Sequence, residues 1–440
     1  DGWRFRRTNP SLPESFQTIE IPKSGPLWRK ALAFAGPGYM VAVGYMDPGN
    51  WATDLAGGAQ FGYTLLSVIL LSNLMAMLLQ ALSIKLGIVT GRDLAQACRD
   101  HFSRPTSFML WVLCEIAIAA MDLAEVIGSA IALNLLFGIP LIWGVVLTSA
   151  DVLIILMLQR KGFRWLEAFI MVLVATIGIC FAIEMILSRP DMAGVVRGLV
   201  PTGQIITNPV MLYIAIGILG ATVMPHNLYL HSAIVQTRKF EPTSEGKRDA
   251  IKWSTIDSTA ALVFAFLINA AILILSAATF HGTAHESVAD IGDAYMLLDP
   301  LLGTTIASTL FAVALLASGQ NATITGTLAG QIVMEGFLDI RLPPWLRRMI
   351  TRVIAIIPAV IVTYIYGEKG TVSLLILSQV ILSLQLSFAV IPLVWFTSSK
   401  AKMGEFVNGR LMIATSFAVV AIIAGLNIWL LIGTVREWLA

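Results

Sequence analysis

The chain has 440 residues, and its 29 lysines and arginines nearly balance its 27 aspartates and glutamates, so nothing in its charge suggests a nucleic-acid partner. Hydrophobic residues make up 57% of the chain and charged residues only 13%, whereas soluble domains carry about 25% charged residues. This composition excludes an ordinary soluble protein and predicts an all-α polytopic membrane protein.

Eleven apolar runs follow one another along the chain, and each is long enough for the helix of roughly 20 residues that spans a bilayer. The first 30 residues are polar and contain prolines, so we expect them to form a cytoplasmic tail. The runs, numbered here as spans 1 to 11, cover residues 33–58, 61–87, 106–135, 139–159, 163–187, 209–236, 254–280, 301–334, 344–366, 371–397 and 411–434.

The distribution of basic residues predicts the orientation in the membrane. With the N-terminus inside, only four of the 29 lysines and arginines fall on the outer side, namely Arg189, Arg197, Lys369 and Arg436. Basic residues near helix ends are retained on the cytoplasmic side. We therefore expect a multi-pass protein of the cell (inner) membrane, with the N-terminus in the cytoplasm and the C-terminus outside.

Spans 1 and 6 carry the same interruption. Residues 47–50 read Asp-Pro-Gly-Asn and residues 224–227 read Met-Pro-His-Asn, each with proline second and asparagine fourth. Proline removes a backbone donor and clashes with the preceding turn, and inside a bilayer the freed carbonyls need protein, water or an ion as partner. One proline alone is explained as well by a simple kink, but a matched pair five spans apart predicts two inverted repeats with the substrate between their broken helices.

This scheme divides the chain into five parts. They are the tail (1–30), a first repeat of spans 1 to 5 (31–187), an outer loop (188–208), a second repeat of spans 6 to 10 (209–397), and a connection with span 11 (398–440).

The two interruptions gather candidate metal ligands. Asp47 lies mid-span, where an ionised carboxylate costs at least about 2.5 kcal/mol. Asn50 offers an amide oxygen, the interrupted backbone near Ala221 a carbonyl, and Met224 a thioether. The oxygen ligands suit a divalent cation, and the sulfur favours Mn²⁺, Fe²⁺ or Cd²⁺ over Mg²⁺ and Ca²⁺, although a methionine considered alone is more often a packing residue.

Span 3 has three acidic residues on one helical face. Glu115 and Asp122 lie about 20° apart, and Glu125 lies about 80° from Glu115. Carboxylates aligned inside a membrane are typical of proton relays, and the alternative is structural pairing with a buried base, for which Arg352 is the best candidate. The two interpretations are compatible.

Two histidines follow the interruption of span 6. His226 and His231 are about 140° apart on a helix, so they cannot both face one site. We expect a gating or proton-linked role for His226, because imidazole titrates near neutrality, and a packing role for His231. Gln379 in span 10 offers another amide, which by itself is better explained by an interhelical hydrogen bond.

These motifs resemble those of the Nramp family of proton-coupled divalent-metal transporters, which includes the bacterial manganese importers. Residues 47–50 and 224–227 match two signatures of the family, and residues 319–326 (Gly-Gln-Asn-Ala-Thr-Ile-Thr-Gly) are similar to a third. That third signature usually carries small hydroxyl residues where this chain has Asn321 and Ala322. The similarity extends over residues 30–434.

The resemblance implies a LeuT-type fold of eleven transmembrane helices with helices 1 and 6 broken. It also implies a set of metal ligands, which are Asp47, Asn50, Met224 and the carbonyl of Ala221, joined by Gln379 when the site closes. By the same matching, Asp122 resembles the carboxylate of the family's proton route. The other members of that route are Glu115, Glu125, Arg352 and His226.

We therefore predict a secondary active transporter, not an enzyme, that imports Mn²⁺, and also Fe²⁺ and Cd²⁺, with protons by alternating access. The expected partners are divalent transition metal ions, protons and the lipid bilayer, and no cofactor is expected. One alternative is a sodium-coupled amino-acid carrier on the same architecture, which the carboxylate at the break disfavours. A cation channel is disfavoured, because it needs rings of ligands along a pore. A membrane metalloenzyme is disfavoured too, because the sequence has no constellation that activates water.

Overall fold

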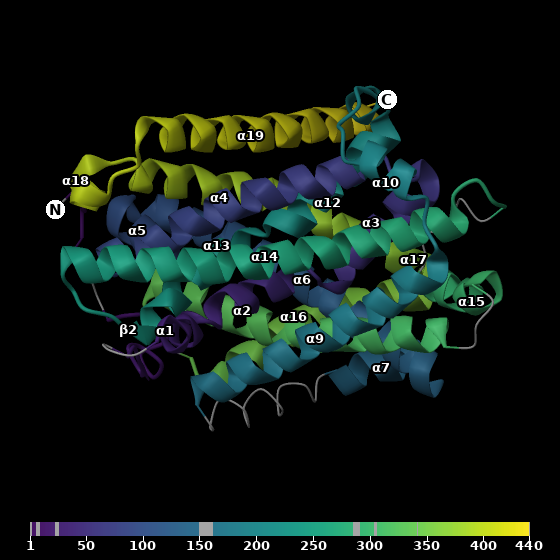
Figure 1. Ribbon diagram of the computed structural model, residues 1–440, viewed down its shortest axis with the longest axis horizontal. Coiled ribbons are helices and arrows are strands. Elements are labelled where there is room, and N and C mark those ends of the chain that lie inside the picture. The colour runs from purple at the N-terminus through teal and green to yellow at the C-terminus, as the bar shows by residue number, and fades with distance from the viewer. Residues whose placement is uncertain are drawn as a thin grey trace.

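The computed structural model describes residues 2–5, 9–22, 26–148, 162–284, 291–302, 306–340 and 342–439. Over these residues the regular secondary structure consists of helices and two short parallel strands, β1 (Ile19–Glu20) and β2 (Arg238–Lys239). Most long helices run along one axis, and the two ends of the chain lie at opposite ends of it (Figure 1). The predicted all-α class is therefore what this part of the chain adopts.

Seven helical segments of the described residues are long and apolar enough to cross a bilayer. They coincide with the predicted spans 2, 3, 5, 6, 7, 10 and 11. The helices that contain them are α4 (Leu66–Thr90), α6 (Arg104–Phe137), α9 (Phe163–Ser188), α12 (Pro209–Val223) with α13 (Pro225–Ile234), α14 (Ser244–Phe280), the second half of α17 (Pro344–Thr397), and α19 (Arg410–Leu439).

The remaining spans are described less fully. Span 8 is α16 (Ala307–Leu338), which carries the polar residues 319–325 in its middle. Span 4 begins with α7 (Leu141–Leu147), and residues 149–161 lie outside the described part.

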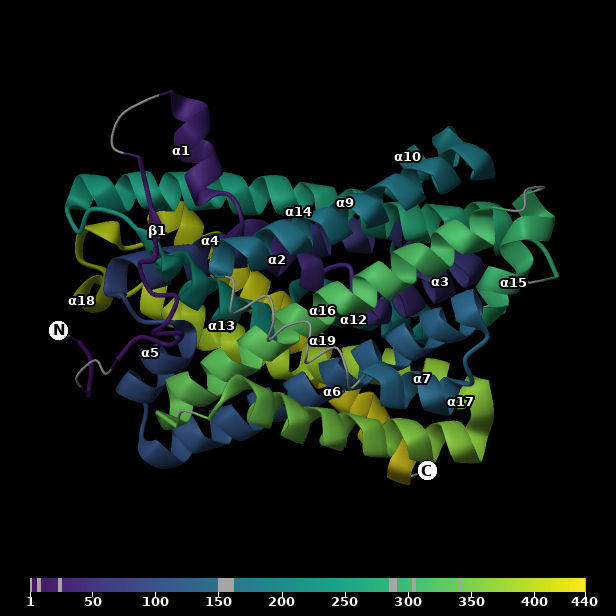
Figure 2. The same ribbon diagram turned by 90° about the horizontal axis from the view of Figure 1, so that it is seen from below.

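Spans 9 and 10 share one helical element whose course reverses (Figure 2), as two spans joined by a turn require. The structure assigns one helical element, α17, of 54 residues. At about 1.5 Å per residue it is more than twice as long as the roughly 30 Å hydrocarbon core, and its ribbon turns back on itself in Figure 2. The predicted connection at residues 367–370 contains glycines but no proline, so no backbone donor is lost there.

The interruption of span 1 is present. The span consists of α2 (Pro37–Gly44) and α3 (Pro48–Phe61), and the short helix α1 (Leu27–Phe34) comes before them. Asp47 caps α3, since its side chain accepts the backbone N–H of Asn50 at 2.8 Å. Pro48 opens α3, at the position where a missing N–H breaks no hydrogen bond.

The interruption of span 6 is present too. Met224 separates α12 from α13, with φ 8° and ψ 111°, and Pro225 opens α13. The prediction that helices 1 and 6 are broken is therefore confirmed at the level of the backbone.

Shorter elements complete the chain, two of them within the predicted outer loop at 188–208. They are α5 (Leu94–His101), α10 (Met192–Gly198), α11 (Gln204–Thr207), η2 (Val235–Thr237), α15 (Ile291–Leu302), α18 (Lys400–Met403) and η3 (Gly404–Phe406).

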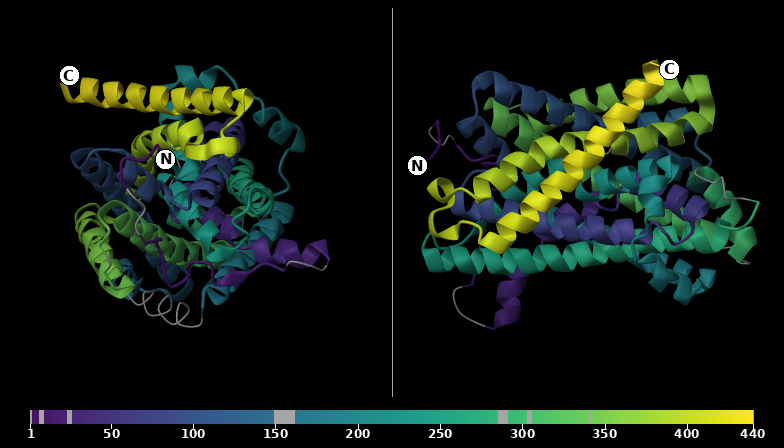
Figure 3. Two further views of the ribbon diagram at one scale, coloured as in Figure 1. Left: turned by 90° about the vertical axis from the view of Figure 1, so that its left-hand side faces the viewer. Right: turned by 90° about the horizontal axis from the view of Figure 1, so that it is seen from above.

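The broken helices occupy the interior of the bundle. Nearly every residue of α2, α3 and α13 is buried. By contrast, α19 lies along one side of the bundle (Figure 3) and exposes apolar residues such as Leu411. A membrane protein exposes apolar side chains to lipid, so the polar breaks lie where lipid does not reach.

Small residues let the broken helices pack closely. A methyl group placed on Gly58 of α3 would lie 2.4 Å from the carbonyl oxygen of Leu273 on α14. Nearby, the Ser276 hydroxyl donates to the carbonyl of Leu55 at 2.7 Å. The backbones of α3 and α14 are thus in direct contact, and a side chain at Gly58 would separate them.

We expect Gly58→Ala to destabilise the protein by about 1–3 kcal/mol, the usual penalty of overpacking. The measurement is thermal unfolding of the purified protein in detergent. Gly425→Ala in α19 is the matched control, because no atom lies within 4 Å of a methyl group at that position. A Gly58→Ala protein that unfolds at the same temperature as the control would show that α3 and α14 separate freely.

Candidate functional site

The two helix breaks face each other. A methyl group on Gly44, the last residue of α2, would lie 3.1 Å from the sulfur of Met224 and 2.2 Å from Nδ2 of Asn227. The same Nδ2 donates to the carbonyl of Val41 in α2 at 3.3 Å. Segments that are far apart in the sequence therefore meet at one point inside the bundle.

Asp47 is fully buried at this point. Its Oδ1 accepts two hydrogen bonds from Asn50, one from the backbone at 2.8 Å and one from the side chain at 3.0 Å. Its Oδ2 has no hydrogen-bond partner among the described residues. A buried oxygen without a donor is costly, and a bound cation would offset that cost.

Asn50 also closes the first break. Its side-chain N–H group donates to the carbonyl of Gly44 at 3.2 Å as well as to Asp47. The amide therefore joins the end of α2 to the beginning of α3, beside the carboxylate.

The second break contributes a carbonyl and a thioether. Ala221 and Met224 are both fully buried. Four residues after Ala221 the chain has Pro225, which has no N–H to donate to the Ala221 carbonyl. That carbonyl is thus available at the end of α12, one turn from the sulfur.

Gln379 reaches the same place from α17. A methyl group on Gly49 would lie 1.8 Å from its Nε2, so the side chain lies directly against the first turn of α3. Its Nε2 donates to the Ser378 hydroxyl at 2.9 Å, and its Oε1 has no hydrogen-bond partner among the described residues. The amide was predicted to join only a closed site, and in this structure it already lies against the break.

The acidic face of α6 begins beside the first break. A methyl group on Gly128 would lie 2.2 Å from Cβ of Pro48, so α6 packs on the start of α3. The carboxylates of Glu125 and Asp47 interact electrostatically. Glu125 and Asp122 are both buried, and a methyl group on Gly326 of α16 would lie 2.8 Å and 3.6 Å from their carboxylate oxygens.

Glu115 continues this face away from the break. It lies two turns before Asp122, about 10 Å along the helix. It is only partly buried, and its Oε1 accepts a hydrogen bond from Nε1 of Trp111 at 3.1 Å. The acids therefore extend from the buried break toward the end of α6 nearer its N-terminus.

His226 lies close to this face. It is fully buried on α13, and within the described part of the chain neither ring nitrogen has a hydrogen-bond partner. The charge of Asp122 acts on its ring. Arg352, predicted as the basic partner of the acids, lies on α17, and its side chain is outside the described residues.

His231 is more than the packing residue that the sequence suggested. Its Nδ1 lies 2.8 Å from Oε1 of Gln80 on α4, and Nε2 of Gln80 donates to the Tyr45 hydroxyl at 2.9 Å. The chain of bonds connects α13 to Tyr45, the residue that follows α2. Sequence reasoning missed Gln80, for which the signal is an amide in the middle of the apolar run 61–87.

Two further polar residues at the breaks were missed. Asn227 joins the second break to α2 through Val41, and its position as fourth residue of the repeated motif was the available signal. Asp54 is buried on α3 and feels the charge of Asp47. It follows Asp47 by seven residues, which is the spacing of one helical face.

The third signature stretch supports the first break from α16. The Ser318 hydroxyl donates to the carbonyl of Met46, which also accepts from Nε1 of Trp51 at 3.2 Å. A methyl group on Gly319 would lie 2.2 Å from Oγ of Ser129, so this glycine lets α16 approach α6. Asn321 is buried, and its amide atoms have no partner among the described residues.

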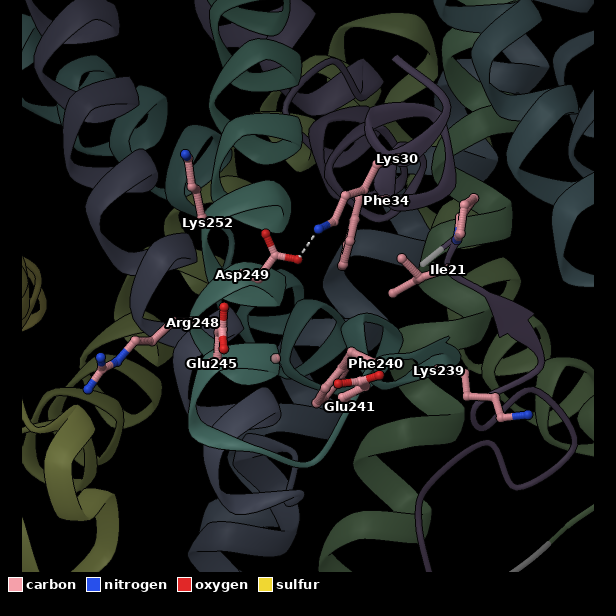
Figure 4. A pocket seen from close by; sticks show the side chains of 12 residues that line it. Ile21, Lys30, Phe34, Lys239, Phe240, Glu241, Glu245, Arg248, Asp249 and Lys252 are labelled. Carbon is pink, nitrogen blue, oxygen red and sulfur yellow. Dashed lines mark ion pairs between the residues drawn. The ribbon is translucent and has the colours of Figure 1, made fainter. Parts of the chain in front are cut away.

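A separate cleft of about 580 Å³ opens at the N-terminal end of the molecule, between α1, β2 and the start of α14. Lys30 and Asp249 form an ion pair across it (Figure 4). Its other charged residues carry both signs and include Glu245 and Lys252. The cleft is not part of the helix breaks.

The family described as "Natural resistance-associated macrophage protein-like", or Nramp, matches residues 38–433. The chain belongs to the Nramp family. It is 65% identical over 430 residues to a divalent metal cation transporter MntH of Nostoc sp., covering 98% of this chain and 97% of that protein. It is 64% identical over 436 residues to one of Listeria innocua, covering 99% and 97%. The predicted resemblance is confirmed, and so is a transporter rather than an enzyme.

Solved structures support the fold. The manganese transporter of Eremococcus coleocola, crystallised with an aromatic bis-isothiourea compound, has a TM-score of 0.88 and 44% identity, covering 95% of this chain and 90% of that one. Mhp1, a nucleobase-cation-symport-1 family transporter, has a TM-score of 0.58 and 14% identity, covering 90% and 92%. The Mhp1 likeness concerns the fold alone and confirms the LeuT-type architecture, while the number of eleven helices stays a prediction.

The contact between Gly49 and Gln379 gives a test of the fifth ligand. We expect Gly49→Ala to displace the Gln379 side chain and to weaken Mn²⁺ binding about 10–100-fold, as loss of ligand positioning does. Calorimetric titration measures the affinity. In a Gln379→Ala background the same change should have little further effect. An equal loss in both backgrounds would show that Gly49 acts without Gln379.

Proposed function

We propose that this chain imports Mn²⁺, and also Fe²⁺ and Cd²⁺, together with protons by alternating access. One observation carries the proposal: the buried Asp47 carboxylate, with one oxygen lacking a donor among the described residues, lies in the break after α2, and Gly44 at the end of α2 packs against the Met224 sulfur of the second break. Carboxylate and sulfur together are the ligands of a borderline-soft divalent cation. The names of the relatives, divalent metal cation transporter and manganese transporter, support the same substrate.

The proposed metal ligands come from the two breaks and from α17. Asp47 and Asn50 come from the first break, Met224 and the carbonyl of Ala221 from the second, and Gln379 from α17. An anionic substrate is disfavoured because the break already holds a carboxylate, and this separates the proposal from the amino-acid carrier.

The proposed proton route uses the acidic face of α6. Glu125 lies nearest to Asp47, Asp122 is next and close to His226, and Glu115 is the most exposed of the three. A protonated carboxyl group beside the metal site can release its proton when a cation arrives, because the cation stabilises the ionised carboxylate. Arg352 is assigned to the same route from the family resemblance.

We further propose that the chain crosses the inner membrane eleven times, in two inverted repeats at residues 31–187 and 209–397. The N-terminus would then be cytoplasmic and the C-terminus outside. The bias of basic residues supports this orientation, and the division of the repeats places one broken helix at the start of each.

The decisive experiment is Mn²⁺ uptake into liposomes with and without an inward proton gradient. Asp47→Ala should abolish binding and uptake, because it removes the charge at the breaks. Asp191→Ala is the matched control: Asp191 also caps a helix, α10, but at an exposed position. Full Mn²⁺ uptake by the Asp47→Ala protein would refute the proposed site. Equal uptake with and without the proton gradient would refute the coupling.

A second prediction separates the proton route from the metal site. Asp122→Asn should suppress metal-driven acidification of the liposome lumen more than it weakens Mn²⁺ binding, because it removes a titrating group and keeps the shape. A pH-sensitive dye in the lumen and calorimetry measure the two effects. Undiminished proton flux at every external pH tested would leave Asp122 with a structural role only.

A third prediction concerns selectivity. Met224→Ala should weaken Cd²⁺ binding most and Mn²⁺ binding less, and it should let Ca²⁺ compete better, since water can fill the vacated position. Mn²⁺ uptake against excess Ca²⁺, in the wild type and the mutant, is the measurement. If Ca²⁺ competes equally in both, cavity size or dehydration decides the selectivity.

A further inference from the structure

The short helix α1 has an apolar face that the protein does not cover. Leu27, Trp28 and Leu32 are 72%, 58% and 57% exposed, while Ala33 and Phe34 are buried. At about 100° per residue, Trp28 lies about 140° from Ala33 and Leu32 lies about 160° from Phe34, so the exposed pair faces away from the buried pair. Exposed apolar patches of this kind mark an interaction surface.

The direction of α1 differs from that of the spans. It runs across α14 rather than along it and projects from the side of the bundle (Figures 2 and 3). A helix in this position lies parallel to the membrane plane if the spans cross the membrane.

Its contacts place α1 at the depth of the lipid headgroups. Lys30 pairs with Asp249 on α14. The first strongly exposed apolar residue on α14 after Asp249 is Ile256, 48% exposed, about 10 Å further along the helix. Headgroup layers are roughly 5–8 Å deep on each side, and amphipathic helices settle about 5–10 Å into this boundary.

A second helix marks the same depth independently. Arg164, at the start of α9, donates to the carbonyl of Leu32 at 2.7 Å. The next residue, Trp165, is 61% exposed. Exposed tryptophans are enriched where a membrane meets water, so Trp28 and Trp165 indicate one interface.

The charges around the apolar face are suited to an anionic lipid surface. Arg29 is exposed, and the ion pairs found among the described residues do not include it. The guanidinium of Arg29 lies 5.3 Å from the ring of Trp28, at the edge of the apolar face. The cleft of Figure 4 lies on the other side of α1, where Asp249 and Glu245 disfavour an anion.

We propose that α1 is an interfacial anchor in the leaflet at the N-terminal end of the molecule, cytoplasmic in the proposed orientation. Trp28 and Leu32 enter the boundary of the acyl chains, and Arg29 binds anionic phospholipid headgroups. The lipid surface covers the face that the protein leaves open.

The anchor is tied to the metal-binding break through α2. Asp257 of α14 accepts the backbone N–H groups of Gly36 and Gly38 at 3.3 Å and 2.7 Å, which fixes the junction of α1 and α2. Gly36 has φ 135°, a conformation that favours glycine. Because α2 ends at Gly44, beside Met224, the position of α1 in the lipid helps to set the position of the break.

Spin-label accessibility in phosphatidylglycerol-containing liposomes tests the placement of α1 without any measurement of transport. Nitroxides are attached to Trp28→Cys, Leu32→Cys and Arg29→Cys, and the three native cysteines, all buried, are replaced by serine. Labels at 28 and 32 should be more accessible to oxygen than to a water-soluble nickel chelate, and the label at 29 should show the reverse. Chelate access at all three positions, or shielding from both reagents by another protein, would overturn the proposal.

Mn²⁺ uptake tests the role of the headgroups. A basic residue near an anionic surface is expected to change association about fivefold, so phosphatidylglycerol should stimulate the wild type about fivefold more than it stimulates Arg29→Gln. Lys239→Gln is the control, since Lys239 already pairs with Glu20 at 3.1 Å. Equal stimulation of the Arg29→Gln protein and the wild type would refute headgroup binding, even where uptake itself is normal.

Discussion

The structure depends on one constraint, the hydrogen bonding of interrupted backbone inside a membrane. Water is not available there, so each carbonyl freed at a break needs a partner from the protein or a bound ion. At the first break, side chains donate hydrogen bonds to three of these carbonyls. Asn50 donates to the carbonyl of Gly44, Asn227 to that of Val41, and Ser318 to that of Met46. Among the described residues, Oδ2 of Asp47 has no hydrogen-bond donor, and Pro225 has no N–H for the carbonyl of Ala221, so both oxygens suit the proposed cation.

The distribution of small residues follows from this constraint. Side chains can reach freed carbonyls only if the neighbouring helices are close. Gly319 and Gly326 bring α16 against α6, and Gly128 brings α6 against Pro48. The third signature stretch is therefore understood chiefly as a packing surface that carries Ser318 to the first break, and the unusual Asn321 lies within it.

Much of the site was predictable because its residues lie in short motifs. A proline inside an apolar run identifies a break, and the residues beside it are then candidate ligands. The sequence did not reveal the contact between His231 and Gln80, because Gln80 stands alone in an apolar run and lies in no motif. The two predicted spans 9 and 10 agree with the reversal of the α17 ribbon (Figure 2). Span 4 and the side chain of Arg352 fall outside the described residues.

The bond from Asn227 to Val41 has a mechanical consequence. It links α13 to α2, and the bonds from Tyr45 through Gln80 to His231 link the same two helices by a second path. Movement of α2 away from α13 breaks both connections, each worth about 0.5–1.5 kcal/mol. The two paths together form a latch that is strong enough to hold one shape and weak enough to release within a single transport cycle.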